Sequence, residues 1–301
     1  MRSRRRVLEG RVRIVDSGDV KRVGVVGCGL MGGGIVEVLA KAGAEGTFIE
    51  GTPTLVDRGR AAVERSVRKA VTKGKLPAQE AEALLGRVTG ATDLAALAQS
   101  DLVIEAATEE IGAKLQIFRT LGEVARPEVV LDSNTSSIPI VELALASGRP
   151  DKVVGMHFFN PPPVLKLLEL TPALTTSQET LALVRAYGTD VLGNTCVQAK
   201  DEAGFIVNRL LIPYLNDAIR LYERGFATRE DIDTAIHLGL AHPMGPLALA
   251  DLIGLDTTLS IAEVLLAEFH EPRYAPPSIL RRMVAAGDLG RKTGRGFYDY
   301  G

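Results

Sequence analysis

The stretch Val23-Gly24-Val25-Val26-Gly27-Cys28-Gly29-Leu30-Met31-Gly32 decides the fold of this 301-residue chain. Residues 23–26 form a short run rich in β-branched residues, which is typical of a buried strand. The Gly-x-Gly-x-x-Gly pattern follows at once, and a helical pattern then runs from Leu30 to Ala42. A strand, a glycine turn and a helix in this order predict the dinucleotide-binding unit of a doubly wound α/β sheet.

Each glycine has a physical task in such a unit. Gly27 permits the tight turn, Gly29 lets the backbone approach a pyrophosphate, and Gly32 lets the helix pack closely on the strand. The free N–H groups and the partial positive charge at the start of the helix then face the pyrophosphate. The predicted cofactor-binding residues of this loop are Gly27, Gly29, Leu30, Met31 and Gly32.

An acidic residue ends the second predicted strand. Glu50 follows Phe48-Ile49 and lies 18 residues after Gly32. A carboxylate there accepts hydrogen bonds from the adenosine ribose hydroxyls and repels a 2′-phosphate, which favours NAD over NADP. Alternatively the glycines are ordinary turn residues and Glu50 is a solvated strand end, but the register of all four features argues against that.

The rest of the chain suggests two domains after a basic lead-in. Helical patterns and short apolar strands alternate as far as Lys200, which indicates a parallel sheet covered on both faces. From Gly204 onward the patterns are mostly helical. We predict a basic tail over 1–20, an NAD-binding Rossmann-type domain over 21–200, and a smaller all-helical C-terminal domain over 201–301. The expected strands after residue 100 cover 102–104, 129–131, 153–158 and 164–170.

Composition and charge exclude several classes of protein. The formal net charge is −2, so we expect no nucleic-acid partner. Charged residues interrupt the most apolar stretch, so we expect no membrane span. The two cysteines lack the spacing of zinc ligands, so we expect no metal and a reducing cytoplasmic location.

The most informative polar residues follow a second apolar strand. His157 ends the strand 153–158, and imidazole is the usual group for proton transfer near neutral pH. Glu169 lies in the apolar run Leu167–Leu170, where a carboxylate is costly unless it is paired. Two strands joined by the turn at Pro161–Pro163 would bring Glu169 beside His157, where it would fix the tautomer. A histidine alone would more often be a satisfied core residue.

Two further polar sites are less decisive. Asn134-Thr135-Ser136-Ser137 follows the strand that ends at Leu131, and ligands of open α/β sheets bind at the carboxyl ends of strands. Taken alone, this stretch would more often be an ordinary loop and helix cap than a ligand site. Asn208 lies in an apolar helix start, and its position by itself leaves a purely structural role open.

Together these motifs make the chain resemble the short L-3-hydroxyacyl-CoA dehydrogenases, especially the bacterial 3-hydroxybutyryl-CoA dehydrogenases. The resemblance covers about residues 21–300. Besides the glycine loop, it rests on Ser133–Ser137, His157–Pro161, Gly204–Arg209, His242–Pro246 and Lys292–Tyr298.

The resemblance implies roles for particular residues. His157 matches the catalytic base, Glu169 its orienting acid, and Ser136 and Asn208 the residues that hold the reacting oxygen. The positions expected to touch the nicotinamide cofactor are Glu109, Lys114, Ser136, Asn160 and Lys292. Ser66 and Lys73 match positions that hold the CoA moiety, although the run from Arg65 to Lys75 would otherwise pass for a solvated helix face.

The resemblance also implies a reaction and an assembly. The expected reaction is NAD-dependent oxidation of a short (S)-3-hydroxyacyl-CoA to the 3-ketoacyl-CoA, or its reverse, by a homodimer. One alternative is a dehydrogenase of a free hydroxy or sugar acid such as L-gulonate. Another is a non-catalytic NAD-binding protein that has kept the fold.

Overall fold

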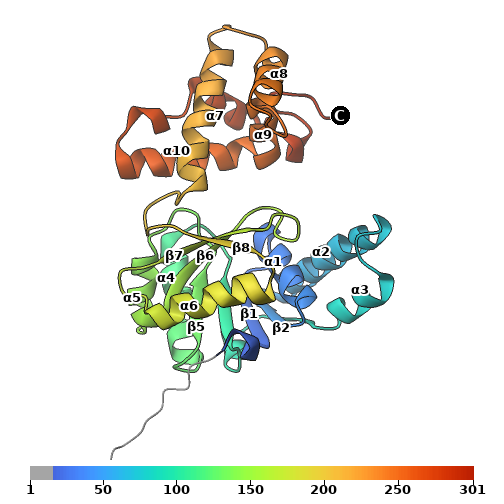
Figure 1. Ribbon diagram of the computed structural model, residues 1–301, viewed down its shortest axis with the longest axis vertical. Coiled ribbons are helices and arrows are strands. Elements are labelled where there is room, and N and C mark those ends of the chain that lie inside the picture. Colours follow the sequence, from blue (N-terminus) through green and yellow to red (C-terminus); the bar gives the residue numbers. More distant parts are fainter. Residues whose placement is uncertain (1–15) are drawn as a thin grey trace, which may run out of the picture. The chain divides into compact units, whose positions relative to one another are not determined.

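The glycine loop joins the first strand to the first helix, as the sequence predicts. β1 (Arg22–Val26) precedes the loop, α1 (Leu30–Lys41) follows it, and β2 (Glu45–Ile49) pairs with β1 in parallel. The computed structural model describes residues 16–301 (Figure 1). Most of the predicted basic tail therefore lies outside the described residues, and Ser17–Asp19 forms a 3-10 turn before β1.

The sheet has eight strands in the order β3-β2-β1-β4-β5-β6-β7-β8. Neighbours pair in parallel except β6 and β7, which pair antiparallel, so β7 and β8 run opposite to the other strands. The later strands are β3 (Val88–Ala91), β4 (Leu102–Glu105), β5 (Val130–Ser133), β6 (Val153–Phe158), β7 (Leu167–Pro172) and β8 (Thr195–Gln198). The predicted parallel strands are therefore confirmed as β1, β2, β4, β5 and β6, and the return at Pro161–Pro163 pairs β7 antiparallel to β6. The strands β3 and β8 were not predicted from the sequence.

The predicted strand at 164–170 begins three residues later than expected. The backbone N–H groups of Val164 and Leu165 both donate to the carbonyl of Pro161, so these residues close a turn. Strand pairing starts only at Leu167, which lies opposite Thr195 of β8. Val164 and Leu165 are apolar but are not strand residues: in the turn, their side chains are 61% and 43% exposed, respectively.

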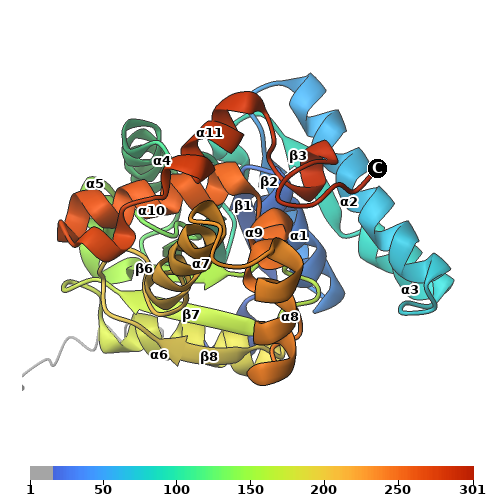
Figure 2. The ribbon, with the colours of Figure 1, turned by 90° about the horizontal axis from the view of Figure 1, so that it is seen from above.

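Helices cover both faces of this sheet. On one face, buried residues of α1, α2 (Pro53–Thr72), α3 (Ala78–Leu85) and α6 (Gln178–Ala186) share one core with Val25, Ile104 and Met156 of the strands. On the other face lie α4 (Ile111–Val124) and α5 (Ile140–Ala146). α2 and α3 pack against each other near the β3 end of the sheet (Figures 1 and 2).

The chain divides into two compact units. The sheet unit holds the chain up to Asn134 together with Ile140–Gln198, and the helical unit holds Thr135–Pro139 with Ala199–Gly301. Its helices, orange to red in Figure 1, are α7 (Val207–Glu223), α8 (Arg229–Gly239), α9 (Pro246–Ile253), α10 (Leu255–Phe269) and α11 (Ser278–Ala286). Among residues 16–301, no helix combines the length and apolar character that a membrane span requires.

Two buried aspartates organise the helical unit and explain its glycine-rich motifs. Asp233 accepts hydrogen bonds from the N–H groups of Leu247 and Ala248 at the start of α9. Asp251 accepts from the N–H groups of Phe297 and Tyr298. A Cβ on Gly245 would meet Asp233 within 2.2 Å, and one on Gly296 would meet Asp251 within 2.0 Å. In the motifs at 242–246 and 292–298, the glycines thus let the backbone pack closely against the carboxylates of Asp233 and Asp251.

Candidate active site

The glycine loop leaves an open approach to the start of α1. Gly27 has φ +90°, and a Cβ there would lie 2.6 Å from the Cα of Ala107. A Cβ on Gly32 would lie 1.9 Å from the carbonyl oxygen of Gly27, whereas one on Gly29 meets nothing within 4 Å. No side chain caps the N-terminus of α1. This arrangement fits a pyrophosphate bound by helix N–H groups at Gly29.

Glu50 lies at the carboxyl end of β2, beside this loop. Its Oε1 accepts a hydrogen bond of 2.6 Å from the N–H of Cys28. The carboxylate is therefore fixed where a dinucleotide places its adenosine ribose. Burial, and next the charge of Glu50, raise the pKa of the Cys28 thiol to about 12, so Cys28 serves as a packing residue rather than a nucleophile.

His157 and Glu169 are opposite one another on the antiparallel strands β6 and β7. The His157 Nδ1 lies 2.9 Å from Glu169 Oε2. Glu169 is fully buried, and the His157 side chain is 9% exposed. Because a carboxylate only accepts, Nδ1 carries the proton in this pair, and the lone pair of the neutral ring is on Nε2. The geometry is that of a general base held by an acid.

Asn134 is a residue that sequence reasoning left without a role. Its side-chain oxygen accepts a hydrogen bond of 2.8 Å from the N–H of Phe158, next to His157. This bond ties the segment after β5 to the end of β6. The available signal was the place of Asn134 directly after a buried strand, which does not reveal the partner.

The other predicted catalytic residues belong to the helical unit. Ser136 lies in the segment Thr135–Pro139, and its carbonyl accepts a hydrogen bond of 3.3 Å from the N–H of Gly204. Asn208 lies in the first turn of α7 and is 7% exposed. Within this unit, Ser136 and the start of α7 are thus linked through the backbone.

The predicted cofactor contacts beyond the glycine loop are divided between the two units. Glu109, Lys114 and Asn160 lie in the sheet unit, and Lys292 lies in the helical unit, where it forms an ion pair with Asp256. Asn160 is exposed after β6. Lys114 differs from the others because its side chain is only 2% exposed and pairs with the buried Glu105.

The predicted CoA residues lie on α2. Ser66 and Lys73 are both exposed, and Lys73 directly follows the last residue of the helix. Burial raises the pKa of the Glu37 carboxyl on α1, and the neighbouring Ser66 hydroxyl partly offsets this. Ser66 therefore lies on the side of α2 that faces α1.

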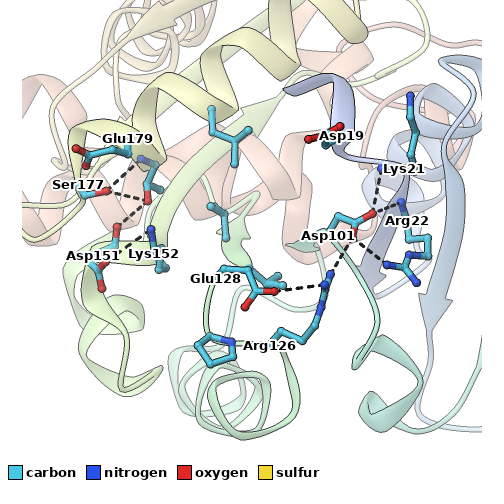
Figure 3. A pocket seen from close by; sticks show the side chains of 15 residues that line it. Asp19, Lys21, Arg22, Asp101, Arg126, Glu128, Asp151, Lys152, Ser177 and Glu179 are labelled. Atoms are coloured by element: carbon cyan, nitrogen blue, oxygen red, sulfur yellow. Dashed lines mark hydrogen bonds and ion pairs between the residues drawn. The ribbon is translucent and has the colours of Figure 1, made fainter. Parts of the chain in front are cut away.

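A pocket of about 1100 Å³ in the sheet unit lies away from these residues. It is lined by Arg22, Asp101 and Lys152 at the amino ends of β1, β4 and β6, whereas the glycine loop and His157 are at carboxyl ends. Figure 3 shows Asp101 between Arg22 and Arg126, with which it forms ion pairs of 3.2 and 2.8 Å. Because this pocket lies at the opposite ends of the strands from the glycine loop and His157, we do not place the chemistry there.

The fold and the site together define a class. A Rossmann-type unit with an intact dinucleotide loop, an acid at the ribose position and a buried His–Glu pair is that of an NAD-dependent oxidoreductase.

Comparisons with known proteins specify the class further. The model of the 3-hydroxyacyl-CoA dehydrogenase NAD-binding domain matches residues 22–202, and that of the C-terminal domain matches residues 204–300. A 3-hydroxybutyryl-CoA dehydrogenase of Mycobacterium tuberculosis is 50% identical over 282 residues, covering 93% of this chain and 99% of the relative. The chain therefore belongs to the 3-hydroxyacyl-CoA dehydrogenase family, with NAD as its cofactor.

Solved structures agree. The crystal structure of M. tuberculosis FadB2 has a TM-score of 0.92 at 50% identity, and covers 94% of this chain and 99% of its own. That of (S)-3-hydroxybutyryl-CoA dehydrogenase PaaH1 from Ralstonia eutropha has a TM-score of 0.87 at 44% identity, with the same coverage. The predictions of fold class, cofactor and enzyme class are confirmed.

Proposed function

We propose that this enzyme interconverts (S)-3-hydroxybutyryl-CoA and acetoacetyl-CoA. The observation that carries the proposal is the His157–Glu169 pair, with Nδ1 and Oε2 2.9 Å apart on neighbouring strands. Similarity to the 3-hydroxybutyryl-CoA dehydrogenases of M. tuberculosis and R. eutropha supports the short acyl chain.

The chemistry follows from what each side chain can hold or move. In the direction of oxidation, His157 Nε2 takes the proton of the 3-hydroxyl, and Glu169 stabilises the imidazolium that forms. NAD, when bound, supplies the acceptor for the hydride that leaves carbon 3. Ser136 and Asn208, a hydroxyl and an amide, hold the reacting oxygen by hydrogen bonds.

The proposal assigns the binding residues as well. The glycine loop from Gly27 to Gly32, together with Glu50, binds the adenosine and pyrophosphate of NAD. The nicotinamide half is bound by Glu109, Lys114, Ser136, Asn160 and Lys292. Ser66 and Lys73 bind the CoA moiety, with Lys73 as the cation for a phosphate.

Assembly and location complete the proposal. The enzyme is a homodimer, supported by large apolar side chains that the helical unit leaves exposed, among them Phe226 at 78% and Leu238 at 71%. It functions in the cytoplasm, in keeping with two free cysteines, Cys28 and Cys196.

The test is consumption of NADH with acetoacetyl-CoA, followed by absorbance. NADPH, a longer 3-ketoacyl-CoA and the oxidation of L-gulonate by NAD are run in parallel. We expect rapid turnover only with NADH and the short CoA thioester. Turnover of gulonate without turnover of any CoA thioester would overturn the proposal, and so would NADH binding without any turnover.

A further inference from the structure

A saturated cluster of polar side chains lies at the carboxyl ends of β4 and β5. The two oxygens of Glu105 lie 2.8 and 2.6 Å from the Nζ of Lys114 on α4. Oε1 also accepts a hydrogen bond of 2.8 Å from the N–H of Ala107, and Oε2 one of 2.7 Å from the hydroxyl of Ser133. Each oxygen thus has two partners, which is the full capacity of a carboxylate.

Burial separates the members of this cluster into those that a ligand can reach and those that it cannot. The side chain of Glu105 is 0% exposed and that of Lys114 is 2% exposed. Glu109, whose Oε2 lies 3.5 Å from Lys114 Nζ, is 48% exposed. Glu105 therefore has neither free lone pairs nor exposed surface with which to contact a cofactor, and any effect it has must act through its neighbours.

Those neighbours form the nicotinamide side of the cofactor site. In an open α/β sheet, a dinucleotide lies across the carboxyl ends of the strands at the point where the strand order reverses, here between β1 and β4. Glu50 marks the adenosine half beyond β2, so the nicotinamide half belongs over β4 and β5. Ala107, held by Glu105, is also the residue against which Gly27 packs.

We propose that Glu105 is a positioning residue for the nicotinamide half of NAD. Its carboxylate fixes the ammonium of Lys114, and Lys114, which has three donors, extends toward Glu109 and holds that exposed carboxylate in place. At the same time, Glu105 fixes Ala107 against the glycine loop. Lys114 then supports the nicotinamide site both with its own ammonium and by holding Glu109 in place.

The experiment compares ligands that do and do not carry nicotinamide. NADH affinity is measured by fluorescence titration, and ADP, which holds only the adenosine half, by calorimetry. Glu105→Gln is expected to weaken NADH binding about tenfold or more, the loss typical of one charge-assisted hydrogen bond, and to change ADP binding less than about twofold. The matched control is Asp101→Asn, which removes a carboxylate at the amino end of the same strand and is expected to leave both affinities unchanged.

Two further variants test whether Glu105 acts through Lys114 and Glu109, and whether misfolding explains the loss of affinity. Glu109→Gln should also weaken NADH selectively, and adding it to Glu105→Gln should cost little more, because both changes break one chain of contacts. The double variant Glu105→Gln/Lys114→Met removes both buried charges, so that no unpaired ion is left in the core to destabilise the fold. This variant should still bind NADH more weakly than the wild type.

Four outcomes would overturn the proposal. They are equal losses for NADH and ADP, unchanged NADH affinity in Glu105→Gln, additive losses for Glu105 and Glu109, and wild-type NADH affinity in the neutral double variant. Because none of these measurements uses turnover, they are independent of the substrate proposed above.

Discussion

At the scale of single residues, our proposal assigns the proton transfer to the pair of His157 and Glu169. The acid is fully buried and 2.9 Å from the ring nitrogen, so the ring is held in one tautomer and one orientation. These two residues lie on β6 and β7, whereas the glycine loop joins β1 to α1, and β4 and β5 lie between β1 and β6 in the sheet. Proton transfer and NAD binding are therefore separable by mutation.

We expect His157→Ala to lower turnover of acetoacetyl-CoA by about a hundred- to ten-thousand-fold, the usual contribution of a general base. NADH affinity, measured by fluorescence titration, should change little. His237→Ala, which removes an exposed histidine of the helical unit, is the control and should retain turnover. Near-normal turnover in His157→Ala would show that another group moves the proton.

The buried carboxyl of Asp132 lowers the stability of the folded protein when it is ionised. It lies in β5 with no exposed surface. Burial, and next the charge of Glu105, raise the pKa of Asp132 well above its usual range. The unfolded chain releases this proton near pH 4 whereas the folded chain keeps it, so rising pH above that point favours the unfolded state.

Replacing this carboxyl with an amide should therefore change how stability depends on pH. The stability of Asp132→Asn relative to the wild type, measured by thermal unfolding, is expected to increase from pH 5 to pH 8. Asp93→Asn, at an exposed cap, serves as the control. A relative stability of Asp132→Asn that is the same at both pH values would contradict the argument.

At the scale of elements, α2 has a narrow buried face and a strongly basic exposed face. Its buried residues are Gly59, Val63 and Val67, at intervals of four, and its exposed side is rich in arginine and lysine. Arg68 is neutralised by ion pairs with Glu64 and Glu82. The positive charge that remains on this helix is the kind of surface that attracts a phosphate-bearing ligand.

Lys73→Ala tests that interpretation. We expect KM for acetoacetyl-CoA to rise severalfold with little change in kcat, because a cation that binds the CoA phosphate acts equally on ground and transition states. KM for the acetoacetyl thioester of pantetheine, which lacks the nucleotide, should not change. Arg68→Ala is the control on the same helix. Equal effects on both thioesters would exclude a contact with the nucleotide.

At the scale of the whole molecule, the helical unit leaves large apolar side chains in solvent. Leu210, Phe226, Leu238 and Leu240 are 71%, 78%, 71% and 58% exposed. Isolated exposed residues of this kind are ordinary, but several in one unit indicate a surface that a partner covers. A second copy of the chain is the partner proposed here.

Phe226→Asp should then convert the protein from dimer to monomer in light scattering at micromolar concentration. A charge buried at an interface typically costs several kcal/mol, enough to weaken association on the order of a thousandfold. Leu174→Asp changes a side chain of the sheet unit that is 97% exposed, and should leave the mass unchanged. A dimer that survives Phe226→Asp would place the interface elsewhere.

The sequence by itself determined the dinucleotide loop and the pairing of His157 with Glu169. The glycine loop and Glu50 could be predicted because their task is local: turn, helix start and strand end are set by residues within one supersecondary unit. His157 and Glu169 could be paired because three prolines between two short apolar strands leave few alternatives to a return beside the first strand.

Tertiary structure alone decided the rest. β3 and β8 are short edge strands with mixed sequences, so only their pairing with β2 and β7 makes them strands. The segment Thr135–Pro139 belongs to the helical unit although it is surrounded in sequence by the sheet unit. The burial of Lys114 depends on Glu105 and Ser133, which lie on two different strands. Contacts between distant segments leave no local periodicity, and such contacts determined each of these features.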